Sequence, residues 1–218
     1  MTNLEIITKT EAYVKETLSS AEGGHDYWHI YRVWKNAQHI AKSETDVNTL
    51  VVELGALLHD IADSKFHDGN EEIGPKTARA FLEKINVPEE TINHVENIVR
   101  HISFKGSLEG QEWTSPELQV VQDADRLDAI GAIGIARTFN YGGHKGRALY
   151  DPNIFPNLEM SKEEYKNSTA PTLNHFYEKL LLLKDLMNTK TGKEIAEQRH
   201  KFMEDYLKQF LAESEGSK

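Results

Sequence analysis

The chain has 218 residues, with 25 Lys and Arg against 35 Asp and Glu and a formal net charge of −10. This acidic balance argues against nonspecific binding to nucleic acid polymers or to anionic membranes. The absence of cysteine excludes disulfides, thiolate metal ligands and a cysteine nucleophile, whereas ten histidines favour nitrogen and oxygen ligands. No apolar run approaches the roughly 20 residues of a membrane span, and the N-terminus lacks a signal-peptide core. We therefore expect a cytoplasmic protein without membrane partners.

The hydrophobic periodicity is helical along nearly all of the chain. Apolar residues recur at steps of three and four in residues 26–40, 50–61, 92–102 and 118–127. Pro88, followed by two glutamates, is typical of a helix N-terminus. Longer helical patterns cover about residues 162–187 and 193–211. No alternating strand pattern and no internal repeat occurs, so the sequence predicts an all-α fold.

Two further expectations concern aromatic residues and a loop. Trp28, Tyr31 and Trp34 recur at helical spacing, which predicts that they lie in the core.

Residues 139–160 are predicted to be irregular because they are rich in glycine and proline. A loop of that length in a compact domain is often functional.

Polar residues that suit metal binding occur in three segments of the predicted helices. In chain order they are His25 and His29; His59, Asp60 and Asp63; and Asp123, Asp125 and Asp128. Burying the adjacent pair His59-Asp60 in an apolar helix is costly unless a partner satisfies both groups, and a divalent metal does so. Asp125 and Asp128 are three residues apart and therefore share one face of a helix.

The ordered set of His29, His59-Asp60 and Asp125 resembles the HD-domain metal-dependent phosphohydrolase superfamily. Members of that family bind their metal with a histidine from one helix, an adjacent His-Asp pair from the next, and an aspartate from a later helix. The resemblance covers about residues 20–150. It implies a single domain over residues 1–218, an HD-domain helical bundle with a C-terminal helical extension at about 160–212.

Carried over residue by residue, the resemblance implies His29, His59, Asp60 and Asp125 as metal ligands. His29 is preferred over His25 because Ile-Tyr-Arg-Val follows it, as in the family's first motif. Asp125 is preferred over the neighbouring aspartates because it precedes Arg-Leu, like the family's Ala-Asp-Arg-Leu element.

The expected cofactor is one divalent ion. Two imidazoles and two carboxylates suit manganese, magnesium, cobalt, nickel, iron or zinc, and manganese or magnesium is favoured. Such an ion activates water and polarises a phosphoryl oxygen, which are the two requirements of phosphate-bond hydrolysis.

The supporting residues have less specific signals. Asp63 lies one helical turn after His59 and is the expected general base, and Asp128 either shares that role or orients a ligand. The expected substrate contacts are Lys65, His94, His101, Lys105, His144, Lys145 and Arg147. The cations among them are suited to holding phosphates. The alternatives are that Lys145 and Arg147 are solvated loop charges, and that His94 and His101 belong to an ordinary helix surface.

The runs His-Asp-Ile-Ala-Asp-Ser-Lys at 59–65 and Gly-Gly-His-Lys-Gly-Arg at 142–147 are similar to a subgroup of small bacterial HD hydrolases. Some members of this subgroup are nucleoside triphosphate pyrophosphohydrolases. The resemblance therefore implies an enzyme that hydrolyses phosphoanhydride or phosphoester bonds in a small phosphorylated molecule, with a nucleotide as the expected substrate. The alternatives are a nucleoside monophosphatase, a cyclic-nucleotide phosphodiesterase, a non-catalytic nucleotide-binding regulatory module, or a di-iron oxygenase that uses His94 and His101. A homodimer is compatible with the sequence.

Overall fold

The computed structural model describes residues 1–19, 26–62, 70–102, 113–161, 164 and 167–217. Within these residues the regular structure is helical throughout and contains no strand, which confirms the predicted all-α class. By its internal contacts the chain divides into two compact units, Met1–Asp125 and Arg126–Lys218. None of the helices in the described residues has the length and apolarity that a membrane crossing requires.

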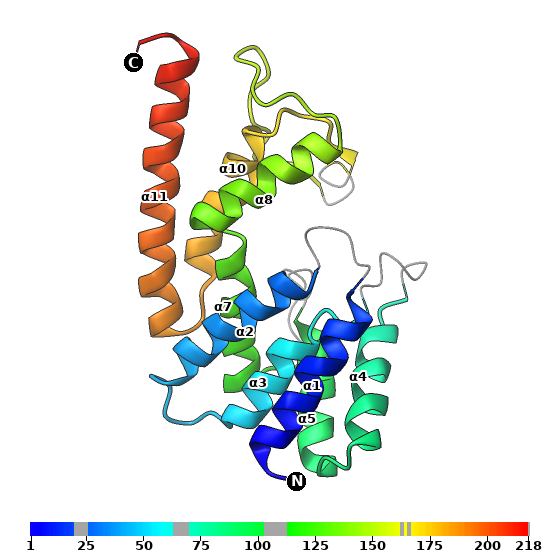
Figure 1. Cartoon of the computed structure of the whole chain (residues 1–218). Coiled ribbons are helices and arrows are strands. Elements are labelled where there is room, and N and C mark those ends of the chain that lie inside the picture. The colour runs from blue at the N-terminus through cyan, green and yellow to red at the C-terminus, as the bar shows by residue number, and fades with distance from the viewer. Residues whose placement is uncertain (20–25, 63–69, 103–112, 162–163, 165–166, 218) are drawn as a thin grey trace. The chain divides into compact units, whose positions relative to one another are not determined.

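The first unit is a bundle around one buried helix (Figure 1). Its elements are α1 (Asn3–Thr17), α2 (Tyr27–Ala41), α3 (Thr49–Leu58), α4 (Ile73–Lys84), α5 (Glu89–His101) and most of α7 (Pro116–Asp128). Helix α3 contacts α1, α2 and α5. It is largely apolar, and Val52, Leu54 and Leu57 are fully buried, as expected of a helix packed against several others.

Close packing in this core depends on Gly55 of α3. A Cβ atom at this position would lie 3.0 Å from Cγ2 of Ile98 on α5 and 3.4 Å from Cγ2 of Val121 on α7. The glycine therefore lets α3 approach both neighbours more closely than any larger residue would allow.

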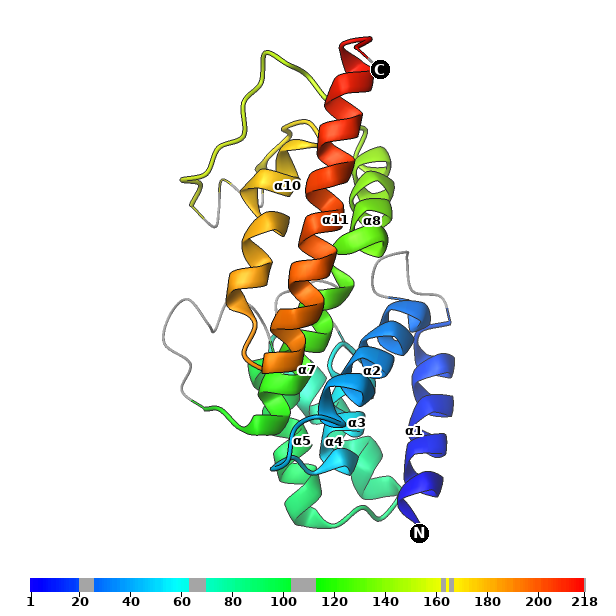
Figure 2. The ribbon, with the colours of Figure 1, turned by 90° about the vertical axis from the view of Figure 1, so that its left-hand side faces the viewer.

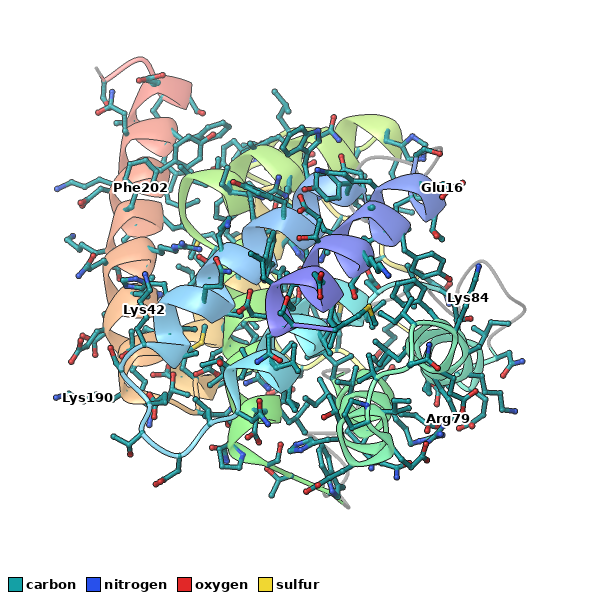
Figure 3. The ribbon with its side chains drawn as sticks, turned by 60° about the horizontal axis from the view of Figure 1, so that its bottom comes forward. Glu16, Lys42, Arg79, Lys84, Lys190 and Phe202 are labelled. Atoms are coloured by element: carbon teal, nitrogen blue, oxygen red, sulfur yellow. The ribbon has the colours of Figure 1, made fainter. Side chains whose placement is uncertain are left out.

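Helices α1 and α4 were not predicted from the hydrophobic periodicity. The signal for α1 is a capping box, in which the Thr2 hydroxyl accepts from the Glu5 N–H and the Glu5 carboxylate accepts from the Thr2 N–H. Helix α4 lacks a side-chain cap and is held to α5 by Arg79, which lies beside the paired helices in Figure 3. Its guanidinium donates to Glu96 at 2.6 Å and to Glu89 at 3.0 Å.

The second unit is built on one long helix, α11 (Lys190–Ser214). Helix α8 (Gly131–His144) and the 3₁₀ helix η2 (Leu180–Leu186) pack on it, and α10 (Asn174–Glu178) contacts η2 (Figure 2). The rings of Phe139 on α8 and Tyr206 on α11 each lie about 6 Å, centroid to centroid, from the other and from the rings of Phe176 on α10 and Phe210 on α11. This aromatic cluster joins the three helices.

Two predicted segments of the second unit were wrong in part. The segment 139–160 is not irregular at its start, because α8 continues to His144 and ends only where Gly146 adopts a φ of 65°. The helix predicted over 162–187 is interrupted in its described part. Pro171 has no N–H and disfavours a helical conformation in the residue before it, so α10 begins at Asn174.

The prediction that three aromatic residues of α2 lie in the core was right only for Trp34. Trp34 is 7% exposed and its indole N–H donates to Glu53 at 2.8 Å, whereas Trp28 is 61% exposed and Tyr31 is half-buried. A step of three residues falls short of one helical turn, so the three rings fan out around α2. Only Trp34 reaches the stripe formed by Ile30, Val33 and Ala37.

Candidate metal centre

His29 lies in the first turn of α2, where Asp26 determines how the helix begins. The Asp26 carboxylate accepts from the His29 N–H at 2.9 Å and so caps the helix. The His29 side chain lies on the buried face of α2 and is 2% exposed. A buried imidazole requires a polar partner, and the arrangement of the neighbouring helices supplies two.

His59 follows directly after the last residue of α3 and is also buried. Its Nδ1 atom lies 2.9 Å from the carbonyl oxygen of Ala56, one turn earlier. Because a carbonyl can only accept, Nδ1 carries the proton and the lone pair of the neutral ring is on Nε2. Metal-binding histidines are oriented in this way by an outer partner.

Asp125 of α7 completes a compact group with the two histidines. The Nε2 atoms of His29 and His59 are 3.3 Å apart, and Asp125 Oδ1 lies 3.5 Å from the first and 3.9 Å from the second. A point equidistant from atoms with these separations lies about 2.1 Å from each, within the roughly 2.0–2.2 Å of zinc bonds to histidine nitrogen or carboxylate oxygen. The three residues therefore fit a divalent ion.

Polar bonds hold α7 in register with the helices that carry the histidines. The Asn36 side chain on α2 donates to the carbonyl of Ala124, the residue before Asp125, at 3.3 Å. At the start of α7, the Glu117 carboxylate accepts from the Asn48 N–H at 2.8 Å. Asn36 was not among the residues predicted from the sequence. Its signal is a position two helical turns after His29, on the same face of α2.

The predicted ligand Asp60 is not part of this compact group. The residues whose ligand atoms all lie within 4.8 Å of one another are, among those described, His29, His59 and Asp125. Asp60 is half-buried and makes a polar interaction of its own. Its assignment as a ligand stays a prediction. The predicted base Asp63 and the predicted substrate contacts Lys65 and Lys105 lie outside the described residues.

The structure gives His94 and His101 of α5 a packing environment beside Trp113. The Trp113 ring centroid lies 5.5 Å from that of His94 and 5.8 Å from that of His101. His94 Nε2 is 2.9 Å from the Ser115 hydroxyl and 3.3 Å from the Glu117 carboxylate. These contacts tie α5 to the start of α7. Substrate binding by the two histidines stays a prediction.

Asp128, a predicted base or orienting residue, belongs to the second unit and is almost fully buried there. Arg137 of α8 donates to its carboxylate at 2.6 Å and to its carbonyl at 3.3 Å. This pair has a direct structural role in connecting the end of α7 to α8. A catalytic role for Asp128 stays a prediction.

The remaining predicted substrate contacts follow the end of α8. His144 is its last residue and is exposed, as is Lys145, whereas Arg147 is half-buried. The Arg147 guanidinium donates to the carbonyl of Ser168. Whether Lys145 and Arg147 are solvated loop charges or substrate contacts stays open. Substrate binding by these three residues stays a prediction.

Comparison with known proteins gives the family. The family model described as HD domain matches residues 27–130. The chain is 35% identical to the protein YpgQ of Bacillus subtilis, over 96% of this chain and 94% of that one. A crystal structure of an HD-superfamily hydrolase from Bacillus thuringiensis is 45% identical, covers 98% of this chain and 99% of its own, and has a TM-score of 0.78.

A second crystal structure is that of Bacillus subtilis YpgQ in complex with ADP. It is 36% identical in the aligned residues, covers 98% of this chain and 97% of its own, and has a TM-score of 0.75. The matches extend over both units of the chain and include the segments that carry His29, His59 and Asp125. The chain belongs to the HD superfamily of hydrolases.

Proposed function

We propose that this hydrolase is a metal-dependent phosphohydrolase that acts on a nucleotide, of the nucleoside triphosphate pyrophosphohydrolase type. The observation that carries the proposal is the convergence of two histidine Nε2 atoms and one carboxylate oxygen from α2, the end of α3 and α7. A site made of nitrogen and oxygen donors suits manganese, magnesium or another divalent ion. Few protein ligands leave coordination positions for substrate and water, as in catalytic rather than structural metal sites.

In the proposed mechanism, different residues bind the metal, accept a proton and orient a ligand. A divalent ion held there supplies Lewis-acid activation of the phosphoryl group and of the attacking water. In this proposal Asp60 completes the ligand set, and the carboxylate of Asp63 takes the proton of the attacking water. The hydrogen bond from His59 to Ala56 keeps the imidazole ring in one orientation while substrate binds and product leaves.

A nucleotide is proposed as substrate because a close relative binds one. The structure of Bacillus subtilis YpgQ contains ADP, and that protein matches this chain over nearly its full length. A nucleotide also needs cationic partners for its phosphates, and Lys65 and Lys105 are proposed for that role. The full-length match further supports our proposal that residues 1–218 act as one HD-type domain, with the metal-binding core at about 20–150.

The test is hydrolysis of a panel of nucleoside triphosphates by the purified full-length protein with manganese, with product identification. Pyrophosphohydrolysis consumes one water and releases equal amounts of nucleoside monophosphate and pyrophosphate. We expect these products from the wild-type protein and none from His59→Ala. Release of orthophosphate without pyrophosphate would reject the pyrophosphohydrolase and favour a phosphatase. Nucleotide binding without turnover of any substrate would instead favour the non-catalytic regulatory module.

Metal analysis tests the di-iron alternative separately. That centre requires further histidine ligands, and His94 and His101 are the candidates. Among the described residues, the compact group of ligand atoms contains His29, His59 and Asp125 and neither of these histidines, which supports a mononuclear centre. We expect one divalent ion per chain. Two irons per chain would favour the oxygenase.

A further inference from the structure

The segment that forms α8 and the following turn has an unusual charge pattern. Residues 129–150 contain no aspartate or glutamate, although the chain has a net charge of −10. Arg137 in this segment is neutralised by Asp128. Lys145 and Arg147 form no ion pair with any carboxylate among the described residues, and both lie near the ring of Tyr141. Positive charge therefore accumulates at one end of α8.

The backbone at the end of α8 brings the side chains of Lys145 and Arg147 close to the ring of Tyr141. The backbone N–H of Lys145 donates to the Tyr141 carbonyl at 3.0 Å, and the backbone N–H of Arg147 donates to the Gly142 carbonyl at 2.9 Å. Gly146 lies between them with a φ of 65°, a conformation that glycine adopts without strain. As a result Lys145 Nζ is 5.6 Å and Arg147 Cζ is 5.7 Å from the centroid of the Tyr141 ring, which is 52% exposed.

The residues just before α10 lie beside the turn that follows α8. The N–H groups of Thr172 and Leu173 donate to the carbonyls of Ala148 and Leu149 at 2.8 and 3.0 Å. This pairing brings α10 close to Arg147. Burial and the positive charges of Lys179 and Arg147 lower the pKa of His175 to about 4. The imidazole is therefore neutral at physiological pH and adds no further repulsion.

The ordinary explanation for cations at this place is the negative end of the helix dipole. That interaction is worth about 0.3–1 kcal/mol and acts within the last turn. It accounts for His144 and Lys145. It does not account for Arg147, which lies beyond the helix and donates to the Ser168 carbonyl at 2.5 Å. Among the described residues the Ser168 carbonyl is the hydrogen-bond acceptor of this side chain. One carbonyl engages only one of the five N–H donors of a guanidinium, and the others suit an anion.

We propose that Tyr141, Lys145 and Arg147 form a phosphate-binding site within residues 126–218. The ligand is an anion that carries two or more phosphate groups. Arg147 binds phosphate oxygens through two parallel N–H groups, Lys145 adds a mobile point charge, and the exposed face of Tyr141 packs beside the ligand. The site uses no metal ligand. If the anion is the phosphate chain of the substrate, this proposal rests on the proposed function. If the anion is free inorganic polyphosphate, it does not.

Titration of the full-length protein with inorganic tripolyphosphate in EDTA, followed by calorimetry, tests this site without the metal centre. We expect the wild-type protein to bind, and Arg147→Gln and Lys145→Gln each to weaken binding by about tenfold. Lys190→Gln should bind like wild type, because Lys190 is an exposed lysine of the same unit at the start of α11 (Figure 3). His59→Ala should also bind like wild type.

Failure of the wild-type protein to bind, or equal affinity in both cation variants and the wild type, would overturn the site. Lys145→Gln keeps the test valid if Arg147→Gln does not fold, because Lys145 is exposed and its side chain makes no hydrogen bond among the described residues. Competition between tripolyphosphate and nucleoside triphosphate would assign the site to the substrate. Binding without competition would assign it to free polyphosphate. A protein that binds tripolyphosphate but releases no pyrophosphate from any nucleotide would reject the proposed function and leave this site intact.

Discussion

The Nδ1 atom of His59 lies 2.9 Å from the carbonyl oxygen of Ala56, so the backbone of α3 itself determines which nitrogen of the ring is protonated. The last turn of a helix has carbonyl groups without intrahelical partners, and His59 uses one of them. This local contact directs Nε2 towards His29 Nε2, 3.3 Å away on α2. A feature of helix geometry thus orients a metal ligand.

Replacing His59 with alanine is expected to abolish metal binding. The variant loses one of three converging donors, which should cost more than the roughly 10- to 100-fold lost with an outer partner. Calorimetric titration with manganese measures the effect. His39→Ala is the matched control, because His39 is an exposed histidine of α2 and should leave the affinity unchanged. Equal affinities in the two variants would show that His59 is not a ligand.

Asp63→Asn is expected to retain the metal and lose rate. Removal of a general base costs about 10²- to 10⁴-fold in turnover and leaves the ligand set intact. Asp60→Asn should instead lose the metal. Manganese affinity and kcat, measured on both variants, separate the two roles. An Asp63→Asn protein without metal would show that Asp63 is a ligand rather than the base.

Asp128→Ala is expected to lower the free energy of unfolding by about 3 kcal/mol, because it leaves Arg137 without its buried partner. Asp185→Ala is the control. Its carboxylate pairs with Lys184 on the surface, and loss of such a pair costs less than about 1 kcal/mol. Urea denaturation measures both values. A similar cost for the two variants would contradict the structural role of Asp128.

Two adjacent glycines of α8 are expected to respond to alanine in opposite directions. A Cβ at Gly142 would lie 2.2 Å from the Thr172 hydroxyl, so Gly142→Ala should destabilise the protein by about 1–3 kcal/mol. A Cβ at Gly143 meets nothing within 4 Å, and Gly143→Ala should stabilise the helix by about 0.5–1 kcal/mol. Thermal unfolding of the two variants tests the pair. Equal melting temperatures would mean that Thr172 does not pack against Gly142.

His175 is expected to make the protein less stable in acid. Its pKa is lowered from 6.5 to about 4 by burial and by the nearby charges of Lys179 and Arg147. Between these two pH values the unfolded chain binds a proton at this histidine that the folded protein does not. The contribution of His175 to the free energy of unfolding is therefore fully present above pH 6.5 and is lost as the pH falls towards 4. The loss amounts to about 3 kcal/mol for this pKa difference.

His175→Gln should flatten that part of the stability profile, measured by urea denaturation at several pH values in EDTA. His39→Gln, at an exposed position of α2, should follow the wild-type profile. Identical slopes for His175→Gln and the wild type would assign the acid sensitivity to other groups.

The sequence predicted four helices of the first unit, α2, α3, α5 and α7, but neither α1 nor α4. In α2, α3, α5 and α7 the apolar spacing and the buried face agree, because each helix packs one continuous stripe into the core. The long pattern over 162–187 failed because apolar periodicity does not register the effect of Pro171 on the backbone. Trp28 was misplaced for a related reason, since a repeat of three residues turns away from the buried stripe.

By itself the sequence determined the all-α class and the helices that supply the metal site, because periodicity and residue type are local properties. Only the tertiary structure decided that His29, His59 and Asp125 converge, that His94 packs against Trp113, and that Asp128 pairs with Arg137. A pattern of apolar residues shows which face of a helix is buried, but not which helix covers it. The convergence of side chains depends on long-range packing, and here on the close approach that Gly55 allows between α3 and its neighbours.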